Sequence, residues 1–329
     1  MLGAALVLLL LLAAECGARY VLGLGDPPLF VRDPQVEYLY RPNQRARRFG
    51  HRILVNAFGM CSRPFDPRDA GVRPRVLVLG DSVVNGANWI DHAELATTIV
   101  ERNLVTRGAR AALVANVSAP SWGPGNWLAY VRKHGLFGAD AIILVVSSHD
   151  AFDNPSFGPL DPASHPTAKP PCALAEAAAI AWRRCRRVLV GETGQTATEV
   201  PRPQALARGL RDLRELLALA RRSGARVAVF QHATRSEALS GHAEPGHDEI
   251  LALCRTEGVE VQSLAPRFRA SMDRGQRPYR DHIHPSAEGQ RILAEAMLEW
   301  LEDRGLPRHR QFRSDERRTA QPSPAPPSH

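Results

Sequence analysis

The residues of this chain with the clearest chemical potential are a serine near the start of an alternating pattern and an Asp–His pair near its end. Ser82 follows Gly80-Asp81 after an apolar run, and Asp281 and His284 lie three residues apart in a later loop. A serine hydroxyl becomes a good nucleophile only when a positioned base takes its proton. An aspartate three residues before a histidine can hold one ring nitrogen, so that the other nitrogen points outward in a fixed tautomer. These residue types predict Ser82 as nucleophile, His284 as base and Asp281 as its orienter.

Each half of this set also has a structural interpretation. Gly80-Asp81-Ser82 is ordinary turn chemistry, and residues 281–284 could be a polar turn before a helix, with His282 as a second ring in the same loop. The catalytic interpretation therefore requires a fold that brings the two segments together.

The pattern between these segments is typical of an α/β protein. Apolar runs that suit buried parallel strands alternate with stretches of helical periodicity. The expected strands are 76–79, 111–117, 141–146, 226–230 and 259–264, and the main expected helices are 94–105, 126–133, 173–187, 204–222, 248–257 and 286–302. This alternation predicts a three-layer α/β/α flavodoxin-like sandwich with a five-stranded, mostly parallel sheet. Ligands bind at the carboxyl ends of such strands, where both Ser82 and the loop with His284 are expected.

The two end blocks together resemble the SGNH/GDSL hydrolase superfamily. The matching residues are Gly80-Asp81-Ser82 after a strand, Gly86 four residues later, and Asp281-His282-Ile283-His284-Pro285 at the end. Asn56-Ala-Phe-Gly59 and the Leu-rich start resemble a bacterial, exported or membrane-anchored subgroup. The similarity covers residues 36–303. It implies a serine esterase that hydrolyses acyl esters, expected to be O-acetyl groups on carbohydrate, and that needs neither a metal nor an organic cofactor.

The resemblance also implies donors that hold the oxyanion formed during ester cleavage. The family uses a backbone amide after the second strand, which corresponds here to Ser121 or Gly123, and an Asn side chain after the third strand, where this sequence has His149. An imidazole N–H can also donate, whereas losing one donor costs roughly 2.7–4 kcal/mol of transition-state stabilisation. The alternative is that His149 caps a turn and the site is impaired.

The chain divides into four expected parts. Residues 4–14 are uninterrupted apolar residues, about the length of a signal-peptide core and short for a bilayer span. The Pro-rich stretch after the third strand has the character of a lid or a binding loop. The expected parts are 1–19 as signal peptide or membrane anchor, 20–74 as a lead-in packed on the main domain, 75–303 as the catalytic domain with a lid-like insertion at 152–203, and 304–329 as a disordered basic tail.

The net charge of +8 does not indicate a nucleic-acid partner. Six Arg against Asp315 and Glu316 lie in the Pro-rich tail 304–329, and no basic stripe interleaved with aromatic residues appears elsewhere. Residues 182–187 combine Trp182 with four Arg and could touch a membrane surface or an acidic polymer, or form a solvated basic face. We expect an exported protein, which is periplasmic, secreted or attached to a membrane through its N-terminus.

The five cysteines have no metal-ligand spacing, so no zinc site is expected. In an exported chain Cys172 and Cys185 could form a disulfide, and free buried thiols are the alternative. The tryptophans at 89, 122 and 127 could stack on sugar rings or pack in the core.

Two other functions compete with ester hydrolysis. The same triad would serve an O-acetyltransferase acting on an exopolysaccharide or a cell-wall glycan. A non-catalytic glycan-binding protein with this fold would explain His149 but not the complete set of Ser82, Asp281 and His284. A nucleotide-binding domain is disfavoured because no Gly-rich phosphate loop follows the first strand.

Overall fold

The computed structural model describes residues 2–109, 111–190 and 202–306, with side chains in the second range described up to residue 186. The expected tail lies outside the described residues except for 304–306, where Leu306 is buried against the main domain. Part of the expected insertion, 191–201, also lies outside them.

A five-stranded parallel sheet forms the centre of the molecule, which confirms the predicted fold class. Its strands follow the order β6-β5-β7-β8-β9, and all neighbours run parallel. The strands are β5 (Arg75–Gly80), β6 (Leu113–Ser118), β7 (Ala141–Ser147), β8 (Arg226–His232) and β9 (Glu260–Ser263). Alternate side chains of β5 serve opposite faces, because Leu77 belongs to one buried cluster and Val76 to the other. Apolar residues at consecutive positions are therefore needed to cover both sides.

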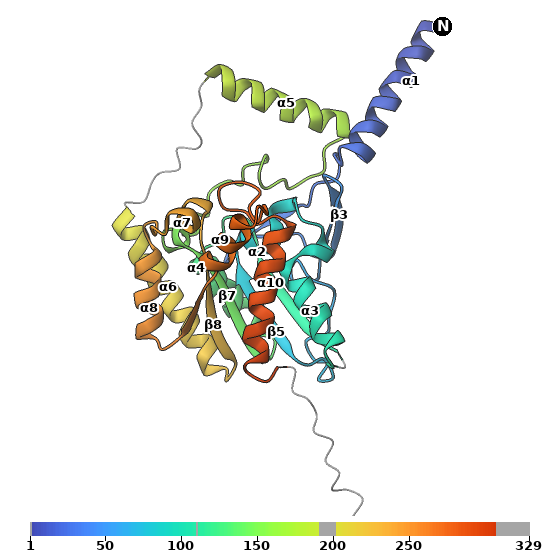
Figure 1. Ribbon diagram of the computed structural model, residues 1–329. Helices are drawn as coiled ribbons and strands as arrows, with labels where there is room; N and C mark the ends of the chain where they lie inside the picture. Colours follow the sequence, from blue (N-terminus) through green and yellow to red (C-terminus); the bar gives the residue numbers. More distant parts are fainter. Residues whose placement is uncertain (1, 110, 191–201, 307–329) are drawn as a thin grey trace, which may run out of the picture.

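Helices cover both faces of the sheet and complete the three layers (Figure 1). On the face of Val76 lie α3 (Ala96–Thr106), α9 (Ala265–Asp273) and α10 (Ala287–Glu302). On the face of Leu77 lie α4 (Pro124–His134), α6 (Arg202–Arg222) and α8 (His247–Thr256). The helices expected from periodicity lie within a few residues of these bounds. The short helices α2 (Ser82–Asn85) and α7 (Arg235–Ser240), together with α9, were not expected, because so few turns give little periodic signal.

Two hairpins precede the sheet and pack on the side of α4. They are β1 (Phe30–Asp33) with β2 (Glu37–Tyr40), and β3 (Gln44–Arg48) with β4 (His51–Val55). Phe30 and Tyr40 are buried in the same cluster as Leu77. Trp122 is also buried there and donates its indole N–H to the Tyr38 carbonyl at 3.2 Å. Trp122 and Trp127 are thus core residues rather than an open sugar-stacking surface.

The described start of the insertion packs along the first hairpin. The Phe30 N–H donates to Pro166 O at 2.8 Å, and Glu37 Oε1 accepts from the N–H groups of Ser156 and Phe157 at 2.8 and 2.9 Å. The chain then enters α5 (Ala173–Val190), which starts at the base of α1 (Leu2–Cys16) and extends away from it (Figure 1). A lid over the site stays a prediction.

The N-terminal helix is apolar and largely exposed. From Leu2 to Val21, through α1 and the π-helical turn η1 (Gly17–Val21), the chain has a mean hydropathy of 1.9 and is long and apolar enough to cross a membrane by length and composition. Side chains such as Leu8 and Leu9 are 59% and 63% exposed.

The disulfide alternative for Cys172 and Cys185 is wrong. All five cysteines are free thiols. Cys172 precedes the first residue of α5 and Cys185 lies thirteen residues further along that helix. A helix of that length rises by about 20 Å, whereas the Cα atoms of a disulfide lie about 4.4–6.8 Å apart. Neither residue is a buried thiol, which was the other alternative. Of the five cysteines, only Cys61 and Cys254 are buried.

Candidate active site

Ser82 lies where the strand order of the sheet reverses. Strand β5 has β6 on one side and β7 on the other, so the loops after these strands diverge and leave a crevice at its carboxyl end. Gly80 ends the strand, and a Cβ there would lie 2.4 Å from Val84 Cγ2, so the close return of α2 requires glycine. Asp81 then caps α2, because its Oδ1 accepts from Val83 N–H at 2.9 Å.

Polar side chains from separate elements hold this turn in place. Gln290 of α10 is fully buried, donates to Val83 O at 2.8 Å and accepts from Ala96 N–H at 2.9 Å. Asn116 of β6 donates to Val84 O at 3.1 Å, and the Trp127 indole donates to Gly80 O at 2.8 Å. None of these positioning residues was expected from the sequence. The only signal was a polar type, such as Gln290, at a position that the periodicity assigns to the apolar face.

The loop with Asp281 and His284 is fixed to the end of β8. Tyr279 donates its hydroxyl to Ala233 O at 2.7 Å. His232 is fully buried, and burial lowers the pKa of its imidazole to about 4. Its ring is therefore neutral, and its Nε2–H donates to Ile283 O at 2.8 Å. Neither tether was expected, because both depend on contacts between segments far apart in the chain.

These supports bring the three predicted residues into one hydrogen-bonded series. His284 Nδ1 lies 2.8 Å from Asp281 Oδ2, and His284 Nε2 lies 3.0 Å from Ser82 Oγ. Burial alone would raise the pKa of Asp281, but hydrogen bonds from the Ile283 and His284 backbone and from the His284 ring lower it to about 2. The ionised carboxylate can only accept, so Nδ1 carries the proton and Nε2 is free to accept from Ser82.

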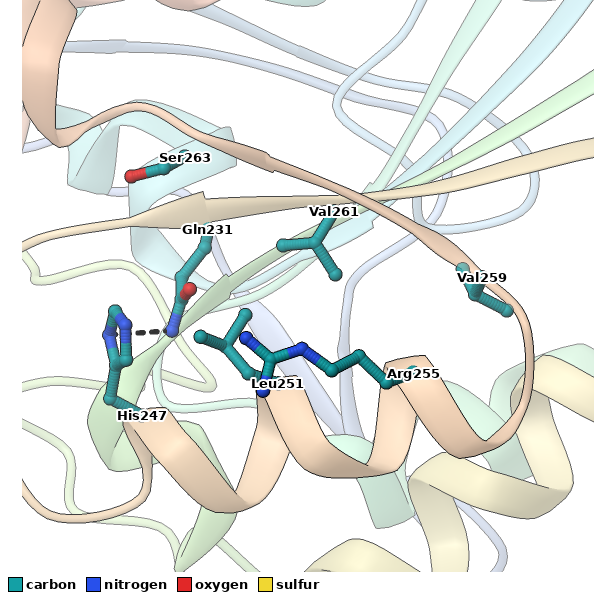
Figure 2. Close-up of a pocket in the computed structure, with 7 residues that line it drawn as sticks. All are labelled: Gln231, His247, Leu251, Arg255, Val259, Val261 and Ser263. Atoms are coloured by element: carbon teal, nitrogen blue, oxygen red, sulfur yellow. Dashed lines mark hydrogen bonds between the residues drawn. The ribbon is translucent and has the colours of Figure 1, made fainter.

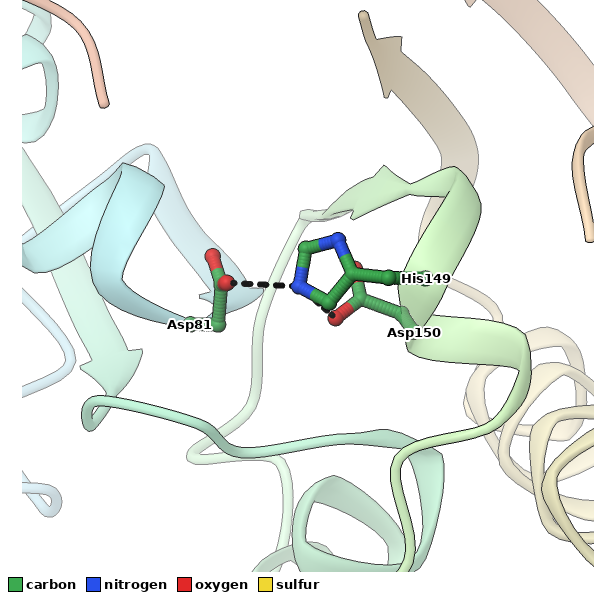
Figure 3. Close-up of side chains that lie close together, drawn as sticks. All are labelled: Asp81, His149 and Asp150. Atoms are coloured by element: carbon green, nitrogen blue, oxygen red, sulfur yellow. Dashed lines mark ion pairs between the residues drawn. The ribbon is translucent and has the colours of Figure 1, made fainter. Parts of the chain in front are cut away.

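His149 lies between Asp81 and Asp150 beside this series (Figure 3), and Asp153 is a third acidic neighbour. Its Nε2 is 3.6 Å from Asp81 Oδ2, 3.5 Å from Asp150 Oδ1 and 3.7 Å from Asp153 Oδ2. Desolvation lowers the pKa of His149, but the charges of Asp150 and Asp81 outweigh it and raise the pKa to about 10. The ring is therefore an imidazolium at neutral pH. The side chain is 40% exposed, so water screens part of this attraction.

The carboxylates around His149 respond differently to burial. Asp81 is desolvated, yet its contact with His149 leaves its pKa lowered. Desolvation raises the pKa of Asp150 well above its usual value and that of Asp153 to about 6. Asp81, His149 and Asp150 also have ligand atoms within 4.8 Å of one another, a set that could hold a divalent cation. The expectation that the protein uses no metal stays a prediction.

The two candidate backbone donors after β6 differ in their surroundings. The Gly123 N–H donates to Asn126 Oδ1 at 3.1 Å, so this amide already has an acceptor. A Cβ at Gly123 would lie 2.2 Å from Asp153 O, which shows how closely the insertion approaches this loop. Ser121 is exposed and has a left-handed φ of 59°. Of the two, Ser121 is the candidate whose amide is not held by Asn126.

Trp89 follows the turn with Ser82, and its ring contacts other side chains of the protein. Its ring stacks on Phe49 with centroids 4.0 Å apart, and the Arg280 guanidinium lies 3.6 Å from its centroid. The loop with Asp281 and His284 is thereby linked to the β3–β4 hairpin. Sugar stacking on Trp89 is not indicated by this arrangement.

A separate hollow of about 350 Å³ lies at the edge of the sheet between α8 and strands β8 and β9 (Figure 2). Gln231 Nε2 and His247 Nδ1 lie 2.7 Å apart at one end of it. None of the predicted site residues lines this hollow, whose lining is Gln231, His247, Leu251, Arg255, Val259, Val261 and Ser263.

Comparison with known proteins gives distant structural similarity only. No family model and no curated protein sequence matches the chain. Similar solved structures include the acetyl xylan esterase AlAXEase, with 14% identity, coverage of 69% of this chain and 99% of that chain, and a TM-score of 0.44. A member of the lipolytic protein G-D-S-L family from Veillonella parvula DSM 2008 has 12% identity, coverage of 68% and 96%, and a TM-score of 0.43. LAE5, an alpha/beta hydrolase enzyme from the metagenome of Lake Arreo, Spain, has 13% identity, coverage of 69% and 94%, and a TM-score of 0.46. At these values the similarities do not by themselves assign a function.

Proposed function

We propose that this chain is a serine esterase of the SGNH/GDSL type. The observation that carries the proposal is the hydrogen-bonded series from Ser82 Oγ through His284 to Asp281, with joining distances of 3.0 and 2.8 Å. A serine, a histidine and an ionised carboxylate in this order are what nucleophilic attack on an ester requires. The sequence blocks that resemble the superfamily supply the same three residues.

In the proposed reaction Ser82 Oγ attacks the ester carbonyl carbon while His284 Nε2 takes its proton. The resulting imidazolium is stabilised by the ionised Asp281. As the tetrahedral intermediate collapses, His284 returns the proton to the departing alcohol and the acyl group remains on Ser82. Water, deprotonated by the same ring, then releases the acid and restores the serine.

The oxyanion is proposed to be held at the start of α2. The Ser82 N–H is at the first helical position, where an amide has no partner within the helix. The Ser121 amide and the His149 ring are the further candidates. To act as a donor, His149 would have to turn its Nε2–H away from Asp81 and toward the oxyanion. Each effective donor contributes roughly 2.7–4 kcal/mol of transition-state stabilisation.

We propose an acetyl ester on carbohydrate as the substrate class and a membrane-attached, exported location. The substrate class rests on the resemblance alone. For the location, the contacts of residues 15–25 with the rest of the protein support an N-terminal helix that is retained rather than cleaved. Ala18 and Leu24 are buried against Ala173 of α5, and the Phe49 N–H donates to Gly23 O at 3.0 Å. A signal peptide that is removed would take Ala18 out of this packing, so we favour an anchor.

The test is hydrolysis of p-nitrophenyl acetate by the full-length chain in detergent. Ser82→Ala should lower turnover by several orders of magnitude, because the nucleophile is lost. Ser164→Ala is a matched control, since Ser164 Oγ lies 2.9 Å from His165 Nδ1 and 3.0 Å from Asp161 Oδ2 outside the site. It should retain the parent rate.

A second pair of variants separates the two rings of the triad loop. His284→Asn should abolish turnover, whereas His282→Asn should not, because His282 is 81% exposed and lies 3.9 Å from Asp281. Equal rates for the parent and Ser82→Ala would overturn the esterase proposal. If the esterase is active, release of acetate from acetylated sugars would then test the proposed substrate class.

A further inference from the structure

Helix α5 is joined to the N-terminal helix at its first turn. Glu15 of α1 accepts from the Ala173 N–H at 2.9 Å through Oε1 and from the Leu174 N–H at 2.9 Å through Oε2. Glu176 of α5 accepts from the Gly25 N–H at 2.6 Å and pairs with Arg48 at 2.7 Å. These contacts from both sides set the direction in which α5 leaves the base of α1.

One face of α5 packs on the protein and the opposite face is open. Ala173, Ala177 and Ile180 belong to the packing around Ala18. Trp182 follows Ala173 by nine residues, or two and a half turns, so it lies on the opposite side of the helix. Its side chain is 68% exposed, and residues 181–186 are all exposed. Such an exposed tryptophan, on the part of the helix that extends beyond its contacts with the protein, indicates a surface that binds a partner.

The charges of α5 identify the chemistry of that partner. Four arginines follow Trp182 within residues 183–187, and no acidic residue follows Glu176 in the helix. At 100° per residue, Arg183 falls on the flank of Glu176, Arg184 falls on the side of Ala173, and Arg186 falls 40° from Trp182, so basic residues surround the exposed Trp. A cluster of Arg around an exposed Trp, next to a helix apolar enough to cross a membrane, is typical of a segment that contacts anionic lipid headgroups.

We propose that α5 is an interfacial helix that lies on the surface of the bilayer entered by α1, with Trp182 inserted among the lipids and Arg183 and Arg184 bound to anionic headgroups. This rests on the anchoring by α1 that forms part of the proposed function. The two helices meet at their bases, and α5 runs off to the side of α1 rather than alongside it (Figure 1). A helix crosswise to a membrane span lies in the plane of the membrane surface.

The same contacts connect the membrane side to the catalytic end of the sheet. Arg48, which pairs with Glu176, lies 4.2 Å from the Phe49 ring centroid, and Phe49 stacks on Trp89. The guanidinium of Arg280, in the loop with Asp281 and His284, stacks on Trp89 in turn. Figure 1 shows α2 at the end of the domain from which α1 and α5 project. An interfacial α5 therefore turns the edge with Ser82 toward the bilayer.

The experiment uses the full chain reconstituted into vesicles of phosphatidylcholine alone or mixed with phosphatidylglycerol, with brominated acyl chains as quenchers. Tryptophan fluorescence of the parent should be quenched, and more strongly when phosphatidylglycerol is present. Trp182→Phe should lose most of this quenching, because Trp122, Trp127 and Trp300 are buried in the domain and the Trp89 ring lies between Phe49 and Arg280. Arg183→Glu with Arg184→Glu should weaken the quenching, whereas Arg208→Glu with Arg222→Glu on exposed positions of α6 should not.

Vesicle flotation and esterase activity distinguish a failure of the α5 proposal from a failure of the proposed anchor or of the proposed esterase. Protein that floats but is quenched no more than Trp182→Phe overturns the role of α5 alone. Protein that does not float overturns the anchoring and this proposal with it. A Trp182 emission shift with polyglutamate but not with either vesicle would favour an acidic polymer and overturn the membrane contact. Parent-level p-nitrophenyl acetate turnover in each variant would show that the triad is intact whatever α5 does.

Discussion

Asp81 contacts both the hydrogen-bonded series of Ser82, His284 and Asp281 and the ring of His149. Its Oδ1 caps α2, while its Oδ2 lies 3.3 Å from Ser82 Oγ and 3.6 Å from His149 Nε2. A neutral Asn at position 149, as the resemblance would have it, would leave the buried Asp81 carboxylate without its compensating charge. His149 and Asp81 therefore form one electrostatic unit. Replacing the His149 ring should therefore lower the free energy of unfolding as well as the activity.

The pH dependence of stability tests this view of His149. Its pKa of about 10 in the folded protein exceeds the usual value near 6.5. The folded state therefore holds an extra proton between these values, and the stabilisation is complete below pH 6.5 and lost as the pH rises toward 10. In urea unfolding of the full chain in detergent between pH 6.5 and 10, the parent should lose about 1–2 kcal/mol more than His149→Asn, after allowance for the exposed ring. Parallel profiles would contradict the charged ring.

Close contacts between elements set the position of the loop that carries His149. Helix α6 approaches the 3-10 turn η4 (Ser148–Ala151) so closely that a Cβ at Gly209 would lie 2.3 Å from Ala151 O. Gly246 approaches the other side of the same turn, where a Cβ would lie 2.1 Å from Ser148 O. The His149 turn is thus clamped between α6 and the start of α8 by backbone that only glycine permits.

Gly209→Ala is a test at this scale because its expected sign is unusual. Glycine to alanine inside a helix normally stabilises by about 1 kcal/mol. Here the clash with the Ala151 backbone should instead destabilise the protein by about 1–3 kcal/mol and displace η4. Gly158→Ala is the control, since its Cβ would only make an ordinary 3.4 Å contact with Ser156 Oγ. Urea unfolding of both variants measures the difference, and a stabilised Gly209→Ala would show that α6 does not press on η4.

The whole molecule combines an α/β/α body with two projecting helices, α1 and α5, at the end of the body where α2 lies (Figure 1). The apolar side chains of α1 are exposed in the isolated chain, a state that water disfavours and a bilayer would relieve. The basic outer part of α5 supplies a second, charge-dependent contact. Hydrophobic anchoring and electrostatic attraction would then orient the body together.

Charges placed in α1 test the anchor. Leu8→Arg with Leu9→Arg should move the chain out of carbonate-washed membranes, because each arginine near the centre of a span costs about 2.5–3.5 kcal/mol. Leu239→Arg, at a 44% exposed position on the body, should leave the membrane fraction unchanged. A double variant that stays in the washed membranes would mean that α1 is not the anchor.

The sequence alone determined the fold class and singled out the three residues that the structure joins in one hydrogen-bonded series. Strands buried on both faces and amphipathic helices leave local periodic patterns, and the Asp281–His284 spacing is itself local. The tertiary structure alone decided what depends on distant contacts: Gln290 and His232 as supports, the occupied Gly123 amide, and the carboxylates around His149. It also decided that the first amide of α5, Ala173 N–H, donates to Glu15 of α1. A contact between segments far apart leaves no periodic signal, because its geometry exists only after the chain has folded.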